Sequence, residues 1–347
     1  MTVRVGVIGC GIGRWHMENY TKVRGARLAA ICDLDEAKLE QAAEAFGVKT
    51  TYTDYRELCA ADDIDAVSVC LPNSLHAPAA VCALEHGKHL LCEKPIADSL
   101  KNARKIAAAA KKADCTAMMA MKLRYGPEAT YVRSVLEKGK LGDVYYSYNS
   151  YLRPLGGIPK MGSWFTRKRF AGGGALIDNG VHLLDLTWWL MGCPKPVAAD
   201  GQGYAKFGPL GKGAKGWTGG ADPEAFDVED LGVGMIRFDN GATALLDNGW
   251  ATLVEPQGVM GIRLLGTQGG ATLWPLRVIA DKGGECVETT PDPAKLKARN
   301  QFEHFIRCIR RGEQPGSTIG QGVTILKMLD ALYRSARVGR SVKIADD

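Results

Sequence analysis

The sequence predicts an α/β protein: a doubly wound parallel sheet, followed by an α+β domain with a large, mostly antiparallel open sheet. The chain has 347 residues, about the length of two average domains. Up to residue 121, apolar runs alternate with helical segments, as in parallel strands joined by helices. Beyond residue 230, several predicted strands follow one another without helices between them. We expect domains at 1–121 and 122–347, with the closing helix 322–339 able to pack back on the first.

The composition is typical of a soluble enzyme and argues against several other classes of protein. The apolar fraction is 46%, the charged fraction 24% and the net charge +6. The longest basic cluster, Arg167-Lys168-Arg169, suits a solvated loop, so no nucleic-acid partner is expected. Ten cysteines are spread singly without a Cys-x-x-Cys pair, which favours reduced thiols and a cytoplasmic location. No leader and no bilayer-spanning apolar run is present, so no membrane association is expected.

A glycine turn follows the first predicted strand, 3–8, and leads directly into a helix. Bare glycine backbone would let the pyrophosphate of a dinucleotide approach N–H groups at the start of that helix. The spacing departs from G-x-G-x-x-G, because the third glycine comes one residue early. The residues assigned to this cofactor loop are Gly9, Gly11, Ile12, Gly13 and Arg14.

Asp33 ends the second predicted strand, 27–32, and lies 33 − 13 = 20 residues beyond Gly13. A carboxylate at this distance can accept hydrogen bonds from the adenosine ribose hydroxyls and would repel a 2′-phosphate. NAD is therefore expected in preference to NADP. The alternative is that Asp33 caps the predicted helix 36–46, a role that is compatible with ribose binding.

Lys94 comes just after the fourth predicted strand of this domain, 89–92, and is held by Pro95. Loops at the carboxyl ends of parallel strands bind ligands, so Lys94 is a candidate for chemistry. The alternative is a surface lysine at a turn. The other expected elements are strands 66–71 and 116–121, and helices 77–86 and 100–113. The other residues expected to bind the cofactor here are Leu71, Pro72, Asn73, His76 and Glu93.

The second domain is expected to open with a helix that ends near Glu137. A long glycine- and proline-rich loop, 153–175, is of the kind that carries binding residues. Its Arg153, Trp164 and Phe165 could form a polar and aromatic platform for a sugar, or the two aromatic rings could only pin the loop to the core. Residues 195–223 are interpreted as a strand and a flexible excursion. The other expected elements are strands 144–152, 231–238, 242–250, 259–265, 271–274 and 277–280, and helices 300–311 and 322–339.

The predicted helix 175–191 is apolar except for a polar stripe. Asp178, His182 and Asp185 stand at i, i+4 and i+7, which places them on one face of an α-helix. Burial of such a stripe costs free energy unless each group finds a partner. Asp178 and His182 could project into a pocket as a carboxylate–imidazole pair, or the stripe could consist of a satisfied core histidine with a capping aspartate. A metal site on all three residues is a further alternative.

Together these motifs resemble the Gfo/Idh/MocA family, the glucose–fructose oxidoreductase and inositol dehydrogenase group. The resemblance covers nearly the whole chain. It rests on the glycine loop with His16 (GCGIGRWH), PNSLH at 72–76, EKP at 93–95, GGALIDNGVH at 173–182, and the closing segments 302–305 and 330–336. The resemblance implies an N-terminal Rossmann domain and a C-terminal domain whose open sheet pairs subunits into homodimers or homotetramers.

The resemblance also implies the chemistry, an NAD-dependent oxidation of a secondary alcohol on a sugar, glycoside or cyclitol. The family's catalytic residues fall on Lys94, Asp178 and His182. His182 would act as general base and Lys94 would stabilise the alkoxide. Substrate contacts are expected from these three residues and from Lys122, Arg124, Arg153 and Trp164. The family often has Asn where Lys122 stands. The cation of Lys122 could favour an anionic or polar substrate group, or could pair with Glu93 or Asp178.

The substrate and two rival functions stay open at this point. The loop Gly156–Pro159 with Trp164 and Phe165 is loosely similar to family members that oxidise C3 of glucosides. Some members are glycosidases that oxidise C3 transiently, and others are regulators that only sense a dinucleotide or a sugar. The intact set of Lys94, Asp178 and His182 argues against a regulator.

Overall fold

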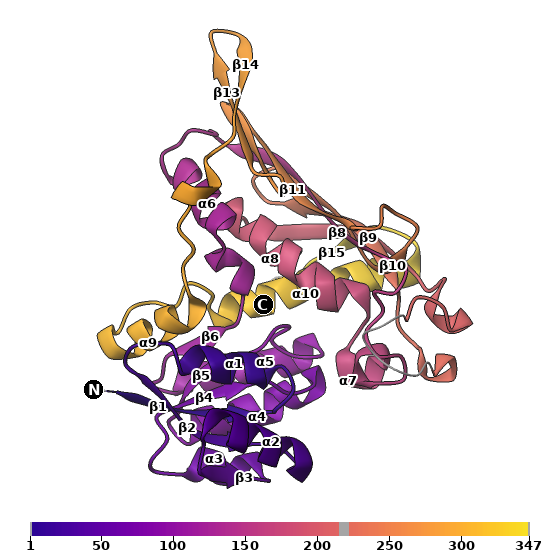
Figure 1. The fold of residues 1–347 in the computed structure, drawn as a ribbon. Coiled ribbons are helices and arrows are strands. Elements are labelled where there is room, and N and C mark those ends of the chain that lie inside the picture. The colour runs from indigo at the N-terminus through magenta and orange to yellow at the C-terminus, as the bar shows by residue number, and fades with distance from the viewer. Residues whose placement is uncertain (1, 215–221, 346–347) are drawn as a thin grey trace. The chain divides into compact units, whose positions relative to one another are not determined.

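A computed structural model describes residues 2–214 and 222–345, and it divides into two compact units (Figure 1). The first unit consists of Met1–Met121 and Asn300–Leu326, and the second of Lys122–Arg299 and Lys327–Asp347. Helix α10 (Ile319–Val338) begins in the first unit and ends in the second. In the described ranges, none of the helices combines the length and the apolar character that a bilayer crossing would need.

The first unit is built on a six-stranded sheet in which all neighbouring strands run parallel. The strand order is β3-β2-β1-β4-β5-β6. Strands β1 to β3 extend the sheet to one side and β4 to β6 extend it to the other, so the predicted doubly wound parallel sheet is confirmed. The strands are β1 Val3–Ile8, β2 Ala26–Cys32, β3 Thr50–Tyr52, β4 Ala66–Val69, β5 His89–Cys92 and β6 Ala117–Met119. The helices are α1 Gly13–Tyr20, α2 Glu36–Phe46, α3 Tyr55–Ala60, α4 Asn73–Glu85, α5 Leu100–Lys112 and α9 Gln301–Arg311.

Some elements of this unit differ from the expectation. Helix α4 begins at Asn73 instead of Ala77, because Pro72, with a φ of −54°, starts the helix as its N-cap. Strand β3 and helix α3 were not predicted. Strand β3 has three residues, none of them buried, so it lacks the apolar run from which a buried strand is recognised.

The second unit contains a nine-stranded sheet of order β14-β13-β12-β11-β7-β10-β9-β8-β15. Strands β7 and β10 run parallel, and the other neighbouring pairs are antiparallel, so the mostly antiparallel sheet is confirmed. The strands are β7 Val144–Pro154, β8 Pro196–Tyr204, β9 Leu231–Phe238, β10 Thr243–Thr252, β11 Val259–Gly266, β12 Gly269–Leu273, β13 Arg277–Lys282, β14 Glu285–Thr289 and β15 Val342–Lys343. The α-helices besides α10 are α6 Pro127–Glu137, α7 Lys168–Ala171 and α8 Val181–Leu190.

Helices α6 and α8 lie along one face of this sheet (Figure 1). The burial pattern of β10 agrees with one covered face, because Ala244, Leu246 and Asn248 are buried while the residues between them are part-exposed. Strand β8 occupies the start of the predicted segment 195–223. The section 215–221 of the predicted flexible excursion lies outside the described residues.

The predicted helix 175–191 is not one regular α-helix. A π-helical turn covers Leu176–Gly180, and α8 follows from Val181. The π-helix is rare and occurs mostly as single turns, often at functional sites. Asp178 lies within this turn, and His182 is the second residue of α8.

Candidate functional site

The glycine loop sits against the carboxyl end of β1, and its glycines have different roles. Gly9 has a φ of +98°, and a Cβ there would overlap the carbonyl oxygen of Cys70. At Gly13 a Cβ would lie 3.0 Å from Val7 Cγ1, so this glycine lets α1 pack on the sheet. Gly11 is exposed, and a Cβ there would meet nothing within 4 Å. The backbone at Gly11 therefore has open space beside it, which fits the approach of a pyrophosphate.

Asp33 lies at the end of β2 and ties the glycine loop to the following turn. Its Oδ2 accepts a 2.6 Å hydrogen bond from the Cys10 N–H, and its Oδ1 accepts one of 2.9 Å from Asp35 N–H. The alternative that Asp33 caps the next helix is wrong. Asp35 is the N-cap of α2, with its side chain accepting from the Lys38 N–H. Asp33 thus presents a part-exposed carboxylate beside the loop, where a ribose would lie.

Two residues assigned to the cofactor loops make contacts inside the protein. The guanidinium of Arg14 lies 5.7 Å from the centroid of the Phe46 ring. His76 is fully buried, with Nδ1 2.8 Å from the Pro95 carbonyl oxygen and Nε2 2.7 Å from that of Leu71. Both ring nitrogens therefore face backbone carbonyls. His76 joins the loops that follow β4 and β5, and we remove it from the residues expected to contact a cofactor directly.

Glu93 is also held within the protein, by His16, for which no role was expected. Its Oε1 lies 2.9 Å from His16 Nε2, and its Oε2 accepts a 3.0 Å hydrogen bond from the Lys94 N–H. Burial would raise the pKa of Glu93, but the contact with His16 and the charge of Lys94 lower it to about 2. The carboxylate thus fixes the backbone from which the Lys94 side chain extends.

Lys94 is the residue at which this segment opens to solvent. Of the eight residues Leu90–Ala97, seven are buried and only Lys94 is part-exposed. A surface turn would expose several neighbouring residues, whereas here a single lysine extends from a buried backbone. Asn73, the first residue of α4, is 5% exposed, and Leu71 and Pro72 before it are part-exposed.

In the second unit, Asp178 and His182 open to solvent in the same way. Of the 18 residues 173–190, 15 are buried, and only Asp178, His182 and Trp189 are part-exposed. His182 is therefore not fully buried. Trp250, from β10, donates a 2.9 Å hydrogen bond from its Nε1 to Oδ2 of Asp178.

The third member of the polar stripe, Asp185, forms a buried ion pair with Arg124. Nη2 and Nε of Arg124 lie 2.6 and 2.9 Å from the two carboxylate oxygens, and the residues are 3% and 1% exposed. Burial opposes the charge of Arg124, but Asp185 keeps its pKa raised. Asp185 is therefore a structural partner of Arg124. Arg124, which was expected to contact substrate, is committed to this pair, and we remove it from that set.

The ion pair also bears on the metal alternative. A metal on the polar stripe would require the Asp185 carboxylate, which Arg124 already occupies. Within 2–214 and 222–345, no three His, Cys, Asp or Glu side chains are grouped as metal ligands.

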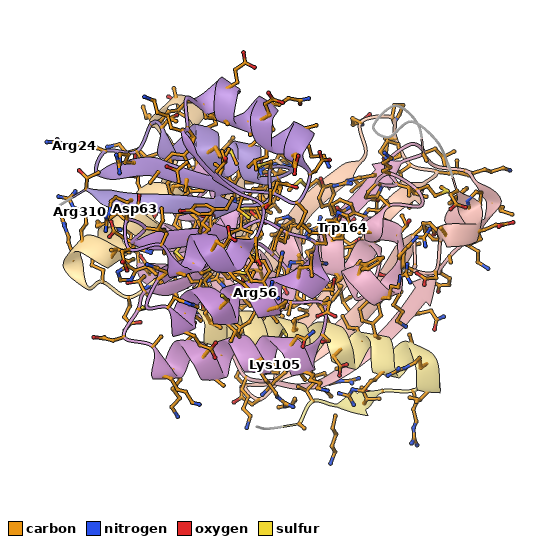
Figure 2. All side chains as sticks on the ribbon, turned by 90° about the horizontal axis from the view of Figure 1, so that it is seen from below. Arg24, Arg56, Asp63, Lys105, Trp164 and Arg310 are labelled. Carbon is orange, nitrogen blue, oxygen red and sulfur yellow. The ribbon has the colours of Figure 1, made fainter. Side chains whose placement is uncertain are left out.

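The loop 153–175 is anchored by residues other than its aromatic pair. Ile158 and Met161 enter a buried cluster with Trp250, Phe226 and other apolar side chains. Trp164, labelled in Figure 2, stacks on Phe165 with ring centroids 3.8 Å apart. Both rings are part-exposed. Arg153 donates from Nη1 to the Gly157 carbonyl oxygen at 3.3 Å. Of the two interpretations of the aromatic pair, a platform with an accessible face agrees better with this arrangement.

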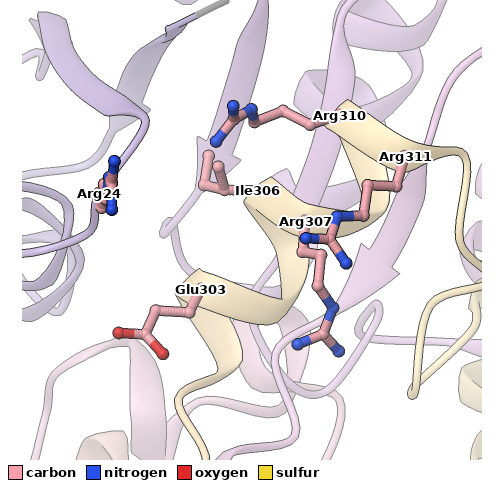
Figure 3. A pocket seen from close by; sticks show the side chains of 6 residues that line it. All are labelled: Arg24, Glu303, Ile306, Arg307, Arg310 and Arg311. Carbon is pink, nitrogen blue, oxygen red and sulfur yellow. The ribbon is translucent and has the colours of Figure 1, made fainter.

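A hollow of about 340 Å³ in the first unit involves none of these residues (Figure 3). Its lining residues are Arg24, Glu303, Ile306, Arg307, Arg310 and Arg311. Arg24 precedes β2, so the hollow lies toward the amino ends of the strands, away from the glycine loop. Glu313 pairs with Arg307 at 2.7 Å and with Arg311 at 3.6 Å. All four arginines are exposed and can be hydrated, so the hollow is a solvated basic face that requires no ligand.

Comparison with known proteins gives matches along most of the chain. Residues 3–121 match a family model described as "Oxidoreductase family, NAD-binding Rossmann fold", and residues 129–272 match the GFO/IDH/MocA C-terminal domain. D-glucoside 3-dehydrogenase of Escherichia coli is 31% identical over 99% of this chain and 97% of its own. Levoglucosan dehydrogenase of Pseudarthrobacter phenanthrenivorans is 32% identical over 71% of this chain and 67% of its own. The crystal structure of an oxidoreductase domain protein from Kribbella flavida covers both chains fully, with 26% identity and a TM-score of 0.88.

Proposed function

The chain belongs to the GFO/IDH/MocA family of oxidoreductases, and from this we propose that it transfers a hydride between NAD and a secondary alcohol of a sugar, glycoside or cyclitol. The observation that carries the proposal is the exposure of Lys94, Asp178 and His182 in segments that are otherwise buried. Lys94 belongs to the first unit and the other two to the second. The proposal includes that all three act on one substrate.

The three side chains would divide the chemistry between them. Bound NAD would supply the hydride acceptor, C4 of its nicotinamide ring. In the oxidative direction His182 takes the hydroxyl proton, because the pKa of an ordinary imidazole, about 6.5, suits a base near neutral pH. Lys94 donates a hydrogen bond to the same oxygen and stabilises the developing alkoxide. Asp178, oriented by Trp250, positions His182 or accepts a hydrogen bond from a neighbouring hydroxyl.

NAD is the proposed cofactor because of Asp33. Each oxygen of its carboxylate already accepts one backbone N–H and has a further lone pair for a ribose hydroxyl. A 2′-phosphate at the same place would bring two anions together without a basic side chain directly after Asp33 to compensate. Gly11 leaves the space that the pyrophosphate needs.

For the substrate, we propose a glucoside or related pyranoside that is oxidised at C3. The relative that supports this choice, D-glucoside 3-dehydrogenase, is similar over nearly its full length. In this chain the stacked pair Trp164 and Phe165 would receive the apolar face of a sugar ring, and Arg153 and Lys122 would bind hydroxyl groups. A homodimer or homotetramer formed through the nine-stranded sheet is part of the same proposal, and light scattering at micromolar concentration tests it.

The decisive experiment measures NAD reduction with a panel of glucosides, aldoses and inositols, with NADP in parallel. We expect NADH to form with a glucoside, and the product to be the 3-keto sugar by NMR. His182→Ala and Lys94→Ala should each lower kcat by about 100-fold or more. His86→Ala, at an exposed histidine after α4, serves as the control and should retain the wild-type rate.

Two outcomes would contradict the proposal. If His182→Ala and Lys94→Ala both retained the wild-type rate, the catalytic assignment would be wrong. Release of the aglycone without net NADH would instead identify the transient-oxidation glycosidase chemistry.

A further inference from the structure

The π turn that carries Asp178 is held by a carboxylate from another part of the chain. Glu229 precedes β9, and its carboxylate accepts hydrogen bonds of 3.0 Å from the Gly174 N–H and of 3.0 Å from the Leu176 N–H. The N–H between them, that of Ala175, donates to the backbone carbonyl of Glu229 at 3.1 Å. One residue therefore receives three consecutive peptide N–H groups where the chain enters the π turn.

Tyr333, from α10, completes the arrangement. Its hydroxyl donates a 2.8 Å hydrogen bond to the same Glu229 oxygen that receives Leu176. The backbone approaches these groups closely, because a Cβ at Gly173 would overlap the Tyr333 hydroxyl and one at Gly174 would overlap the Glu229 carbonyl. Only glycine therefore fits at positions 173 and 174, because Tyr333 and Glu229 approach the backbone there so closely.

The arrangement solves a problem specific to the start of a helical segment. The first N–H groups of a helix have no partner within it, and an acceptor must be supplied from elsewhere. The side chain of Ala175, the residue before the π turn, can make no capping bond. A carboxylate satisfies these donors and also interacts favourably with the positive end of the helix dipole. Asp178 follows directly, with its N–H donating to the Gly174 carbonyl at 3.0 Å.

We propose that Glu229, together with Tyr333, is a positioning residue that holds the π turn and thereby sets the orientation of Asp178 and His182. The inference rests on the proposed function for its catalytic consequence. The carboxylate accepts at both oxygens, because the Gly174 N–H lies 3.0 Å from each, while Leu176 and Tyr333 donate to Oε1. In Glu229→Gln the amide NH₂ would replace one of these acceptors, and it would face the Gly174 N–H, donor against donor.

The experiment compares Glu229→Gln with a control in the adjacent residue. Asp230 holds a different loop through a single oxygen, Oδ2, which accepts from the N–H groups of Lys206, Phe207 and Gly208 at 2.7–2.9 Å. Asp230→Asn removes the charge that strengthens these hydrogen bonds and should weaken this loop without affecting the π turn. Tyr333→Phe removes one hydrogen bond and keeps the ring, so it serves as a milder variant should Glu229→Gln fold poorly.

In steady-state kinetics, Glu229→Gln should lower kcat by about 10- to 100-fold, since small displacements of catalytic groups have effects of this size. Tyr333→Phe should lower kcat by a few-fold, and the KM for NAD should change less than twofold in both. Asp230→Asn should retain the wild-type kcat. Equal losses of kcat in Glu229→Gln and Asp230→Asn would overturn the inference, because they would reflect general destabilisation.

Amide hydrogen exchange followed by mass spectrometry separates this inference from the proposed function. Glu229→Gln should accelerate exchange in the peptide 173–182, whereas Asp230→Asn should accelerate it around 206–208. This result would support the role of Glu229 in holding the π turn even if no sugar reduced NAD. Unchanged exchange in 173–182 would overturn the inference whether or not the protein is an active dehydrogenase.

Discussion

The indole Nε1 of Trp250 donates a 2.9 Å hydrogen bond to Oδ2 of Asp178. Trp250 is fully buried in β10, and Asp178 is part-exposed in the π turn. The hydrogen bond therefore connects the buried core of the second unit to a proposed catalytic carboxylate. Burial restrains the indole, so the carboxylate plane is oriented by a rigid group, the usual way in which a supporting residue positions a functional one.

Trp250→Phe should separate this orienting role from packing. The variant loses the N–H donor and leaves a small cavity, so we expect a loss of about 1–3 kcal/mol in the free energy of unfolding. The value of kcat/KM should fall by about 10-fold. Trp188→Phe is the control, because the Trp188 indole donates to the Pro194 carbonyl at 2.8 Å and is also buried. Equal effects of the two variants on kcat/KM, measured beside urea unfolding, would exclude an orienting role.

Asp33→Asn tests the choice of cofactor. The amide cannot accept from the ribose hydroxyls while preserving both the Cys10 and Asp35 contacts, and it removes the repulsion of a 2′-phosphate. We expect the KM for NAD to rise by about 10-fold, while the KM for NADP stays constant or falls. The measurement is the ratio of kcat/KM for the two cofactors. An unchanged ratio would show that Asp33 only organises the loop.

Breaking the buried ion pair of Arg124 and Asp185 from one side should strongly destabilise the second unit. Asp185→Asn leaves the buried guanidinium without its counter-ion, which should lower the free energy of unfolding by about 3–5 kcal/mol. The double variant Arg124→Met, Asp185→Leu removes both charges and should recover much of that loss. Urea unfolding of the two variants measures the difference. A double variant as unstable as the single one would mean that packing around the pair matters more than its charge.

The contact between His16 and Glu93 predicts a pH-dependent contribution to stability. The pKa of Glu93 is lowered from 4.5 to about 2, so the charged form is stabilised in the folded state by about 3 kcal/mol. This contribution is fully present above pH 4.5 and is lost as the pH falls toward 2. The difference in unfolding free energy between wild type and Glu93→Gln should therefore shrink on acidification. Glu18→Gln, at an exposed glutamate, should show almost no difference at any pH.

Much of the fold follows from local patterns. Strands β1, β5 and β9 have the bounds expected from the sequence, because each is an apolar or alternating run that ends at turn residues. Strands β3 and β14 were missed, since neither contains a buried residue. The start of α4 was placed too late because Pro72 was assigned to a loop, although proline can precede a helix.

In the candidate site, too, some residues could be predicted from local sequence patterns and others could not. Lys94 could be named from the sequence because it follows a buried strand and is held by Pro95. Asp178 and His182 could be named because each interrupts an apolar run, and a polar group in such a run needs a reason. Their supporting residues could not be named. Trp250 is 72 residues from Asp178, His16 is 77 from Glu93, and Glu229 is 55 from Gly174. No local periodicity connects residues at such separations.

The amino-acid pattern alone therefore accounts for the alternation of strands and helices, the glycine loop and the polar stripe, because these depend on neighbours within a few turns of the chain. The folded structure alone shows that the stripe begins in a π turn and that Asp185 belongs to Arg124. It also shows that Asp33 clamps the glycine loop without capping α2. Hydrogen-bond partners that are distant in sequence decide these features, since a buried polar group pairs with whatever the packed elements bring to it.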